Sequence, residues 1–313
     1  MFKLVTFFAF ISIVSTCFAS ESNVDNLQNR EDSIQSLLNE IIKTESVSKK
    51  LKLNEELVST FQECLQIEES FDYPFDKLEN IGKLKSNDDK LRVFTWNIPL
   101  QNGAQKYFGF IQIKHQGSIN VFTLNDERDS IENPQNDIIS HEKWYGALYY
   151  NLHEVEANNN TFYTLLGVDL NDFLSTKRVI EALHINHNGE PVFGYPLFRV
   201  RNKVINRIIF EYSSKANLVL KWDERHDMIV FNHLSPLQPS FKGNFQYYVP
   251  DLSFDGFRFE ENQWVYIADI DIRNPQRDRP PAPVEPPEED FEPGFLYRAG
   301  GKTQNESETE NNR

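Results

Sequence analysis

Residues 143–172 have the sequence "KWYGALYYNLHEVEANNNTFYTLLGVDLND", which carries the strongest structural signal in the chain. Two runs rich in aromatic, aliphatic and β-branched residues flank the polar segment "ANNN" at 157–160. Asparagine tolerates the positive φ angles of tight turns, so the pattern predicts a β-hairpin with strands at 144–155 and 161–169. Both faces of this hairpin are largely apolar, which indicates a central position with cover on both sides.

A turn at 157–160 also sets the pairing of the two strands. His153 then faces Thr164, and Tyr150 faces Gly167, where an aromatic ring covers the gap left by a glycine. We expect the aromatic residues to act mainly as packing between layers. Asn151, His153 and Thr164 interrupt one apolar face with polar groups, so they form the candidate ligand-binding site. The alternative is that His153 is a core histidine bonded to its neighbours.

The rest of residues 71–272 follows the same pattern. Short β-branched and aromatic runs alternate with Asn, Asp, Gly and Pro clusters, and the connections are too short to hold helices. The sequence therefore predicts an all-β domain, either an antiparallel sandwich or a partly closed barrel of about a dozen strands. Besides the first hairpin, the predicted strands are 91–96, 107–113, 119–124, 178–185, 191–198, 204–212, 217–222, 228–234, 257–260 and 264–270.

Residues 20–70 are predicted to form a small helical pair before the sheet domain. Apolar residues recur three and four positions apart, which is the signature of one helix face. The residues concerned are Ile34, Leu37, Leu38, Ile41 and Ile42 in the first helix, and Leu57, Phe61, Cys64 and Leu65 in the second. Cys64 lies on the apolar side, so we interpret it as a buried small hydrophobe and not as a nucleophile.

Both ends of the chain have the composition of segments outside the fold. Residues 1–19 combine Lys3, an apolar run and a small-x-small site at 17–19, and this predicts a secretory signal peptide. In an alternative interpretation, Cys17 is lipidated and anchors the chain to a membrane. Residues 273–313 are rich in proline and acidic residues, so we expect a disordered tail. Its aromatic island "FEPGFLYR" (291–298) is either an unstructured remnant or a docking segment.

Charge and cysteine content exclude several classes of protein. The net charge is -15, with 47 acidic against 32 basic residues, so the surface repels phosphate backbones and nucleic acid is not expected as a partner. With Cys17 in the signal segment, Cys64 has no partner, and a disulfide framework is not predicted. No later segment has the length of an apolar transmembrane helix.

Motifs of catalysis are missing from the sequence. It contains no nucleophile elbow, no His-Glu-x-x-His, no glycine-rich phosphate loop and no paired cysteines. No cofactor is predicted beyond a candidate calcium site at "DLND", where Asp169, Asn171 and Asp172 bring oxygen ligands together. A similar cluster is "SNDD" at 86–89. The alternative for both is an ordinary turn, because Asp and Asn are common turn formers.

Several segments between about 71 and 267 resemble a family of uncharacterised exported proteins of Gram-negative bacteria with no assigned activity. The resemblance is carried by "FDYPFD", "LRVFTWN", "KWYGALYY", "YTLLGVD", "PVFGYPLF", "IIFEYSSKANLVLKWDE", "MIVFNHL" and "FDGFRFEENQWV". It implies export and a single domain, and it implies no reaction. The helical segment and the proline-rich tail lie outside the similarity.

We therefore expect an exported, non-catalytic binding or scaffold protein, periplasmic or at the cell surface. Its partner would be an envelope protein, a glycan or a small molecule, and the sequence leaves the oligomeric state open. This hypothesis predicts an exposed aromatic patch rimmed by polar residues. One alternative is an envelope hydrolase, which requires carboxylates or a histidine converging in a cleft. Another is a carrier that holds an apolar small molecule in a barrel interior.

Overall fold

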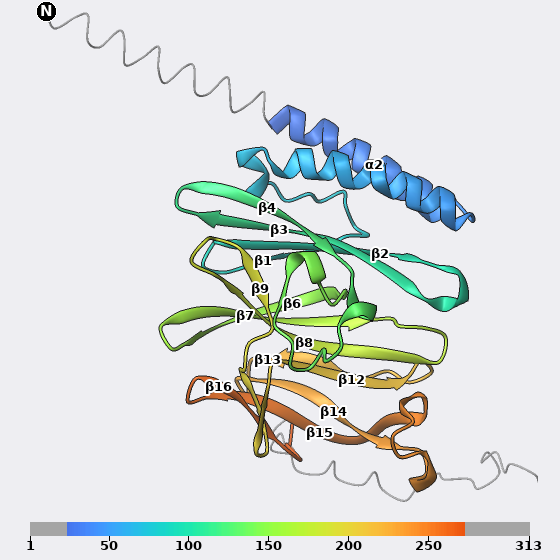
Figure 1. Ribbon diagram of the computed structural model, residues 1–313, viewed down its shortest axis with the longest axis vertical. Coiled ribbons are helices and arrows are strands. Elements are labelled where there is room, and N and C mark those ends of the chain that lie inside the picture. Colours follow the sequence, from blue (N-terminus) through green and yellow to red (C-terminus); the bar gives the residue numbers. More distant parts are fainter. Residues whose placement is uncertain (1–23, 273–313) are drawn as a thin grey trace, which may run out of the picture. The chain divides into compact units, whose positions relative to one another are not determined.

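Residues 24–272 are described by the computed structural model, and they form two helices followed by sixteen strands in three sheets (Figure 1). The predicted all-β class with a preceding helical pair is confirmed. None of the three sheets in these residues closes into a barrel, so the sandwich is the correct alternative. The predictions for residues 1–19, including Cys17, and for the tail at 273–313 lie outside the described residues.

The helical pair consists of residues 24–43 and of α2 (Val47–Leu65). The Ser46 hydroxyl caps α2 by accepting a hydrogen bond from the Lys49 backbone N–H. The predicted face of α2 is fully buried, including Cys64. In the first helix Ile41 is buried but Ile42 is 58% exposed, so its assignment to the apolar face was wrong. Adjacent helical residues point about 100° apart, and only Ile41 faces the core.

The first sheet has the order β1-β2-β3-β4 and lies directly under the helical pair (Figure 1). Phe61 of α2 packs edge-to-face against Phe75, Phe94 and Phe110, with ring centroids 5.1–5.6 Å apart. These rings fill the space between helices and sheet. The strands are β1 (Gly82–Lys85), β2 (Leu91–Pro99), β3 (Gln105–His115) and β4 (Ser118–Asn125).

A buried arginine attaches the segment that follows α2 to this sheet. Arg92 Nη1 donates to the carbonyls of Ser70, Phe71 and Tyr73 at 2.7–2.9 Å. Burial lowers the pKa of Arg92 to about 10, which leaves the group charged at neutral pH. The Arg92 side chain therefore provides a hydrogen-bond donor for three backbone carbonyls in the segment after α2, which pairs with no strand.

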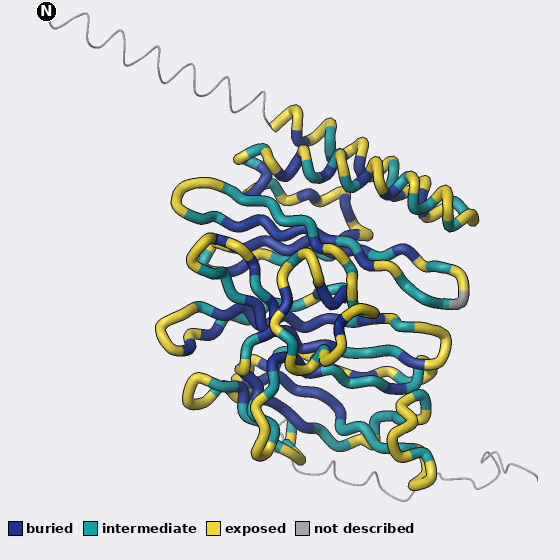
Figure 2. The backbone as a smooth tube through the Cα atoms, viewed as in Figure 1, coloured by how far each residue is buried: buried dark blue, intermediate teal, exposed yellow. Residues whose placement is uncertain are grey.

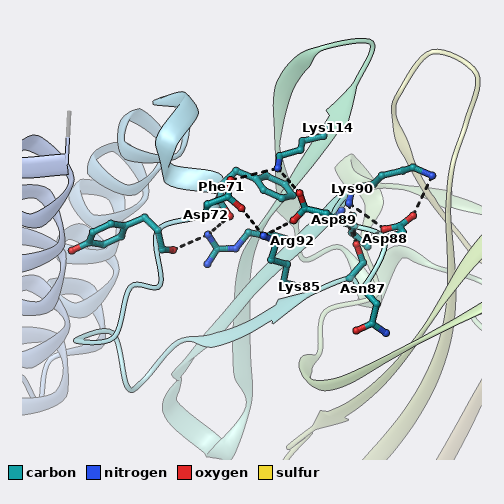
Figure 3. Close-up of polar contacts among 12 residues, drawn as sticks. Phe71, Asp72, Lys85, Asn87, Asp88, Asp89, Lys90, Arg92 and Lys114 are labelled. Carbon is teal, nitrogen blue, oxygen red and sulfur yellow. Dashed lines mark hydrogen bonds and ion pairs between the residues drawn. The ribbon is translucent and has the colours of Figure 1, made fainter. Parts of the chain in front are cut away.

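Above this arginine two lysines and two aspartates form a closed ring of ion pairs (Figure 3). Lys85 Nζ lies 2.6 Å from Asp72 and 2.5 Å from Asp89. Lys114 Nζ lies 3.6 and 2.8 Å from the same two carboxylates. Both ammonium groups also lie over the Phe71 ring. Hydrogen bonds from Lys114 and Lys85 lower the pKa of Asp89 to about 2.

The middle sheet contains the hairpin at 143–172 and is covered on both faces (Figure 2). One face packs against the first sheet through Tyr163 and Leu165, and the other packs against the last sheet through Phe162 and Leu166. The predicted central position of the hairpin is therefore confirmed. The strands are β5 (Ile139–Ser140), β6 (Leu148–Ala157), β7 (Asn160–Asp169), β8 (Ser175–Ile185), β9 (Pro191–Phe193) and β12 (Arg207–Ser213).

The predicted turn and most of the predicted register are confirmed. Asn158 and Asn159 both have positive φ, and His153 pairs with Thr164. The register shifts before Asn151, so Tyr149 and not Tyr150 pairs with Gly167. A Cβ on Gly167 would lie 2.8 Å from the Tyr149 ring. The aromatic ring does cover the glycine, but a β-bulge at residue 150 moves the pairing by one residue.

The last sheet has the order β11-β10-β16-β15-β14-β13. Its pairs are antiparallel except β10 with β16, which run parallel. Phe257 and Trp264 are among the residues that pack against the middle sheet. The strands are β10 (Phe198–Val200), β11 (Lys203–Ile205), β13 (Leu220–Asp223), β14 (Met228–Pro236), β15 (Tyr248–Glu260) and β16 (Gln263–Ile267).

Every predicted strand segment contains a strand, but two of them break in the structure. The segment 191–198 divides into β9 and β10, and 204–212 divides into β11 and β12. At Asn206 the chain passes from the last sheet to the middle sheet, and its amide donates to the Asn136 carbonyl. The short strands β1 and β5 were not predicted.

A fully buried ion pair joins β8 and β12 at the centre of the molecule. Arg207 Nε donates to Glu181 Oε2 at 2.5 Å, and both side chains have 0% exposure. Arg207 Nη1 also donates to the Pro134 carbonyl. Within the described residues, Arg207 Nη2 and Glu181 Oε1 have no hydrogen-bond partner. Desolvation raises the pKa of Glu181 in spite of its pairing with Arg207.

We predict that Arg207→Met lowers the free energy of unfolding by about 3–5 kcal/mol, because it leaves the Glu181 carboxylate buried without its counter-charge. The double variant Glu181→Leu/Arg207→Met should recover most of this loss, since both charges are then removed. Urea unfolding of the three proteins measures the difference. A double variant no more stable than the single one would contradict this account.

Candidate functional site

The sequence-predicted residues Asn151, His153 and Thr164 lie together on the face of the middle sheet that packs against the last sheet. Thr164 is fully buried, and its hydroxyl accepts a hydrogen bond from Trp264 Nε1 at 2.9 Å. The His153 ring stacks on Trp222 at 3.7 Å, and burial lowers the pKa of His153. Asn151 Oδ1 is buried without a partner in the described residues. Indole rings cover this face, which fits the packing alternative.

We predict that Thr164→Val destabilises the protein by about 1–3 kcal/mol, because the change preserves the shape but leaves the buried Trp264 N–H unpaired. The matched control is Thr161→Val on the same strand, since that hydroxyl bonds the exposed Glu156. Thermal unfolding of both variants is the measurement. Equal stability of the two variants would show that the interlayer hydrogen bond contributes nothing.

The candidate calcium ligands at 169–172 are engaged in hydrogen bonds of the fold. Asp169 is buried, and its Oδ1 accepts from the Tyr107 hydroxyl of β3 at 3.0 Å and from the Asn171 backbone N–H at 2.8 Å. Asp172 accepts from backbone N–H groups of residues 174–175. The backbone bonds are those of an ordinary turn, whereas Asp169 Oδ2 is buried without a partner in the described residues. In the part of the chain that the structure describes, no three His, Cys, Asp or Glu side chains are grouped to hold a metal.

The second acidic cluster, at 86–89, is also built into the fold. Asp88 Oδ1 accepts from the Ser86 hydroxyl at 2.6 Å, and Asp88 Oδ2 accepts from the Tyr163 hydroxyl at 2.8 Å. Asp89 belongs to the ring of ion pairs shown in Figure 3. The loop therefore connects the first sheet to the middle sheet through the Tyr163 hydrogen bond.

A different region has the features of a recognition site. Beyond the ladder with β13 and β16, the strands β14 and β15 continue as a two-stranded hairpin, which we call the arm (residues 234–254) (Figure 1). A bulge between Asn232 and Leu234 marks its beginning. Its tip holds two short 3-10 turns, η5 (Pro239–Phe241) and η6 (Phe245–Tyr247). Proline at the start of η5 has the fixed φ that such a turn needs.

The arm exposes several aromatic and aliphatic side chains, although its tip turn η6 lies against β12. Phe241 and Tyr247 stack with ring centroids 4.3 Å apart and planes 20° apart, and Phe245 lies 5.1 Å from Tyr248. A cluster of exposed apolar side chains of this kind marks an interaction surface. The most exposed members are Leu237 at 60%, Phe245 at 46%, Tyr247 at 37% and Leu252 at 91%.

Polar side chains surround this aromatic surface along the arm. Asp251 accepts hydrogen bonds from the Ser235 and Ser253 hydroxyls, each at 2.7 Å. The Ser235 bond crosses between the two strands of the arm, the Ser253 bond lies within β15, and together they hold the carboxylate in an exposed position. The arm therefore combines ring faces with oriented hydrogen-bond acceptors, which is the composition of sites that bind ligands with both apolar and hydroxyl groups.

At the base of the arm an imidazole is held by a buried carboxylate. Asp255 Oδ2 lies 2.7 Å from His233 Nδ1 and accepts from the Tyr266 hydroxyl at 2.7 Å, while its Oδ1 accepts from the Asp269 backbone N–H at 3.0 Å. The His233 side chain is 44% exposed. The hydrogen bond to Asp255 raises the pKa of His233 against the effect of burial, and the charges of Asp255 and Asp251 act in the same direction.

The pKa of His233 is raised in the folded chain above its ordinary value of 6.5. The interaction of His233 with Asp255 therefore makes its full contribution to stability at pH values below 6.5. The contribution is lost as the pH rises through the raised pKa. We predict that His233→Gln reduces the fall in melting temperature between about pH 6 and about pH 9. The exposed His187→Gln is the control and should keep the dependence of the wild type. An unchanged profile in His233→Gln would contradict the prediction.

The sequence pattern predicts only the flanks of the arm. The predicted strands 228–234 and 257–260 lie on either side of the arm, and no element was predicted for residues 235–256. The signal that could have identified it is the aromatic spacing in "FKGNFQYYVPDLSF" at 241–254. Its rings alternate with Pro, Gly and Asn, so neither helical nor strand periodicity is present.

Comparisons with protein-family models, with curated proteins and with solved structures found no match to this chain. Among residues 24–272, neither helix has the length and apolar character needed to cross a bilayer.

Proposed function

We propose that this chain is an exported, non-catalytic binding protein of the bacterial cell envelope and that the arm is its recognition surface. The signal-peptide pattern of residues 1–19 and the family resemblance support export, with a lipid anchor at Cys17 as the alternative. The observation that carries the proposal is the pair of exposed rings Phe245 and Tyr247 at the tip of a hairpin whose strands also carry the exposed, hydrogen-bonded Asp251. This is the aromatic patch with a polar rim that a binding function requires.

The chemistry of the arm favours a glycan as the ligand. Sugar rings present flat C–H faces that lie against aromatic rings, and their hydroxyl groups donate to oriented carboxylates. Tyr247 and Phe245 offer the ring faces, and Asp251 offers the acceptor. A protein partner with exposed apolar side chains is the competing occupant, because tyrosine and phenylalanine are also enriched in protein interfaces.

The Asp255–His233 pair makes a hydrolase the second candidate function. A carboxylate that binds Nδ1 orients the imidazole and supports its protonated form, which is the arrangement of a general base. Of the described residues, no serine, threonine or cysteine hydrogen-bonds to His233, so the pair would have to activate water. The carrier alternative has no such support, because buried aromatic residues occupy the spaces between the three sheets.

We predict that Phe245→Ser/Tyr247→Ser abolishes binding on a glycan array of envelope polysaccharides while the protein still unfolds cooperatively on heating, since neither ring belongs to the buried clusters between the layers. The matched control is Phe173→Ser, which removes an aromatic side chain that is 73% exposed outside the arm. It should bind as the wild type does.

Loss of binding in both the arm variant and the control, or in neither, would contradict the proposal. If the array shows no ligand but the arm variant loses a partner from envelope extract, the occupant is a protein. Cleavage of a bound glycan by the wild type but not by His233→Gln would favour the hydrolase.

A further inference from the structure

A second, unrelated site lies between α2 and the first sheet, where the two layers leave a cavity of about 370 Å³. This volume is in the range of small-molecule sites. The cavity is lined by α2 on one side and by the end of β4 with the beginning of β3 on the other. An adjoining hollow of about 360 Å³ shares the walls formed by Lys106, Asp126 and Glu127.

The sequence of α2 explains why the layers part at this point. Phe61, near the middle of the helix, is fully buried and fills the space above the sheet. Three and seven positions earlier the helix presents Val58 and Asn54, which are much shorter and lie on the same face. The layers are held apart by the phenylalanine, and the two short side chains leave the volume in front of it open.

Aromatic rings form the floor of the cavity. Trp96 and Phe108 stack with ring centroids 5.9 Å apart and planes 21° apart. The indole is fixed in place because Trp96 Nε1 donates to Asn54 Oδ1 at 2.8 Å. Both rings are among the residues that line the cavity, where they provide apolar contact and a π-system that attracts a cation.

The charged side chains at the mouth carry an excess of negative charge. Glu55 and Glu127 are exposed, and within the described residues neither carboxylate has a hydrogen-bond or ion-pair partner; the same holds for the Lys106 ammonium group. Asp126 is engaged, because it accepts from the Tyr107 backbone N–H at 3.0 Å and lies 3.3 Å from Arg128. Two unpaired carboxylates against one ammonium leave the mouth acidic.

We infer that this cavity binds an organic ammonium ion with an apolar body. The body packs on Trp96 and Phe108, while the charged head lies at the mouth near Glu55 and Glu127. A net charge of -15 for the whole chain raises the local concentration of such cations. The inference is independent of the arm, so its failure leaves the proposed function as it stands.

The test is a calorimetric titration of the purified full chain with three probes of similar size. Phenyltrimethylammonium carries the charge, tert-butylbenzene is its neutral isostere, and benzenesulfonate reverses the sign. The ammonium probe should bind at least about tenfold more tightly than either of the others, and its affinity should fall as salt is added. Equal affinity for the neutral isostere, preference for the sulfonate, or no binding of any probe would overturn the inference.

Variants locate the site. Val58→Phe fills the cavity and should abolish binding, and a melting temperature near that of the wild type shows that the variant is folded. Glu55→Gln should weaken binding several-fold, whereas Glu56→Gln, on α2 but outside the cavity lining, should not. Lys106→Gln should strengthen it. Should Val58→Phe fail to fold, the contrast between Glu55→Gln and Glu56→Gln decides alone: equal affinities would overturn the assignment.

Discussion

The structure depends on the burial of both faces of the middle sheet. A chain whose described residues hold only one cysteine, Cys64, has no disulfide to stabilise it, so apolar area removed from water must supply the stabilisation. A sheet that is apolar on both sides can achieve this only between two other layers. The first sheet with its helices covers one face and the last sheet covers the other, and the ion pair of Arg207 with Glu181 lies within this middle layer. The helical pair in turn covers the outer face of the first sheet.

Local sequence patterns were sufficient for the elements and for the central hairpin, because strand periodicity and Asn-rich turns are local properties. The pairing of His153 with Thr164 follows from the turn alone. The bulge at Tyr150 does not, since it depends on where the Tyr149 ring finds space over Gly167 in the assembled layers. The break at Asn206 depends on tertiary packing in the same way: only one residue separates β11 from β12 in the sequence, and the assembled layers place the two strands in different sheets.

Asn151, His153 and Thr164 were chosen because polar groups interrupt an apolar face, and such interruptions also arise when a neighbouring layer supplies the partner, as Trp264 does for Thr164. A sequence pattern cannot separate these two cases. The arm lacks periodicity because its rings face solvent and its backbone turns twice in a few residues. Exposed segments with an irregular backbone are therefore the parts of this chain that periodicity identifies least well.

The parallel pairing of β10 with β16 has a consequence for how the chain reaches its native state. Residues 198–199 cannot find their partners at 264–265 until nearly all of the described polypeptide has been synthesised. A topology whose closing contact spans so much sequence raises the contact order, and proteins of high contact order fold slowly. The last sheet is therefore completed only after β16 has been made, whereas the first sheet pairs neighbouring strands along the chain, in the order β1-β2-β3-β4.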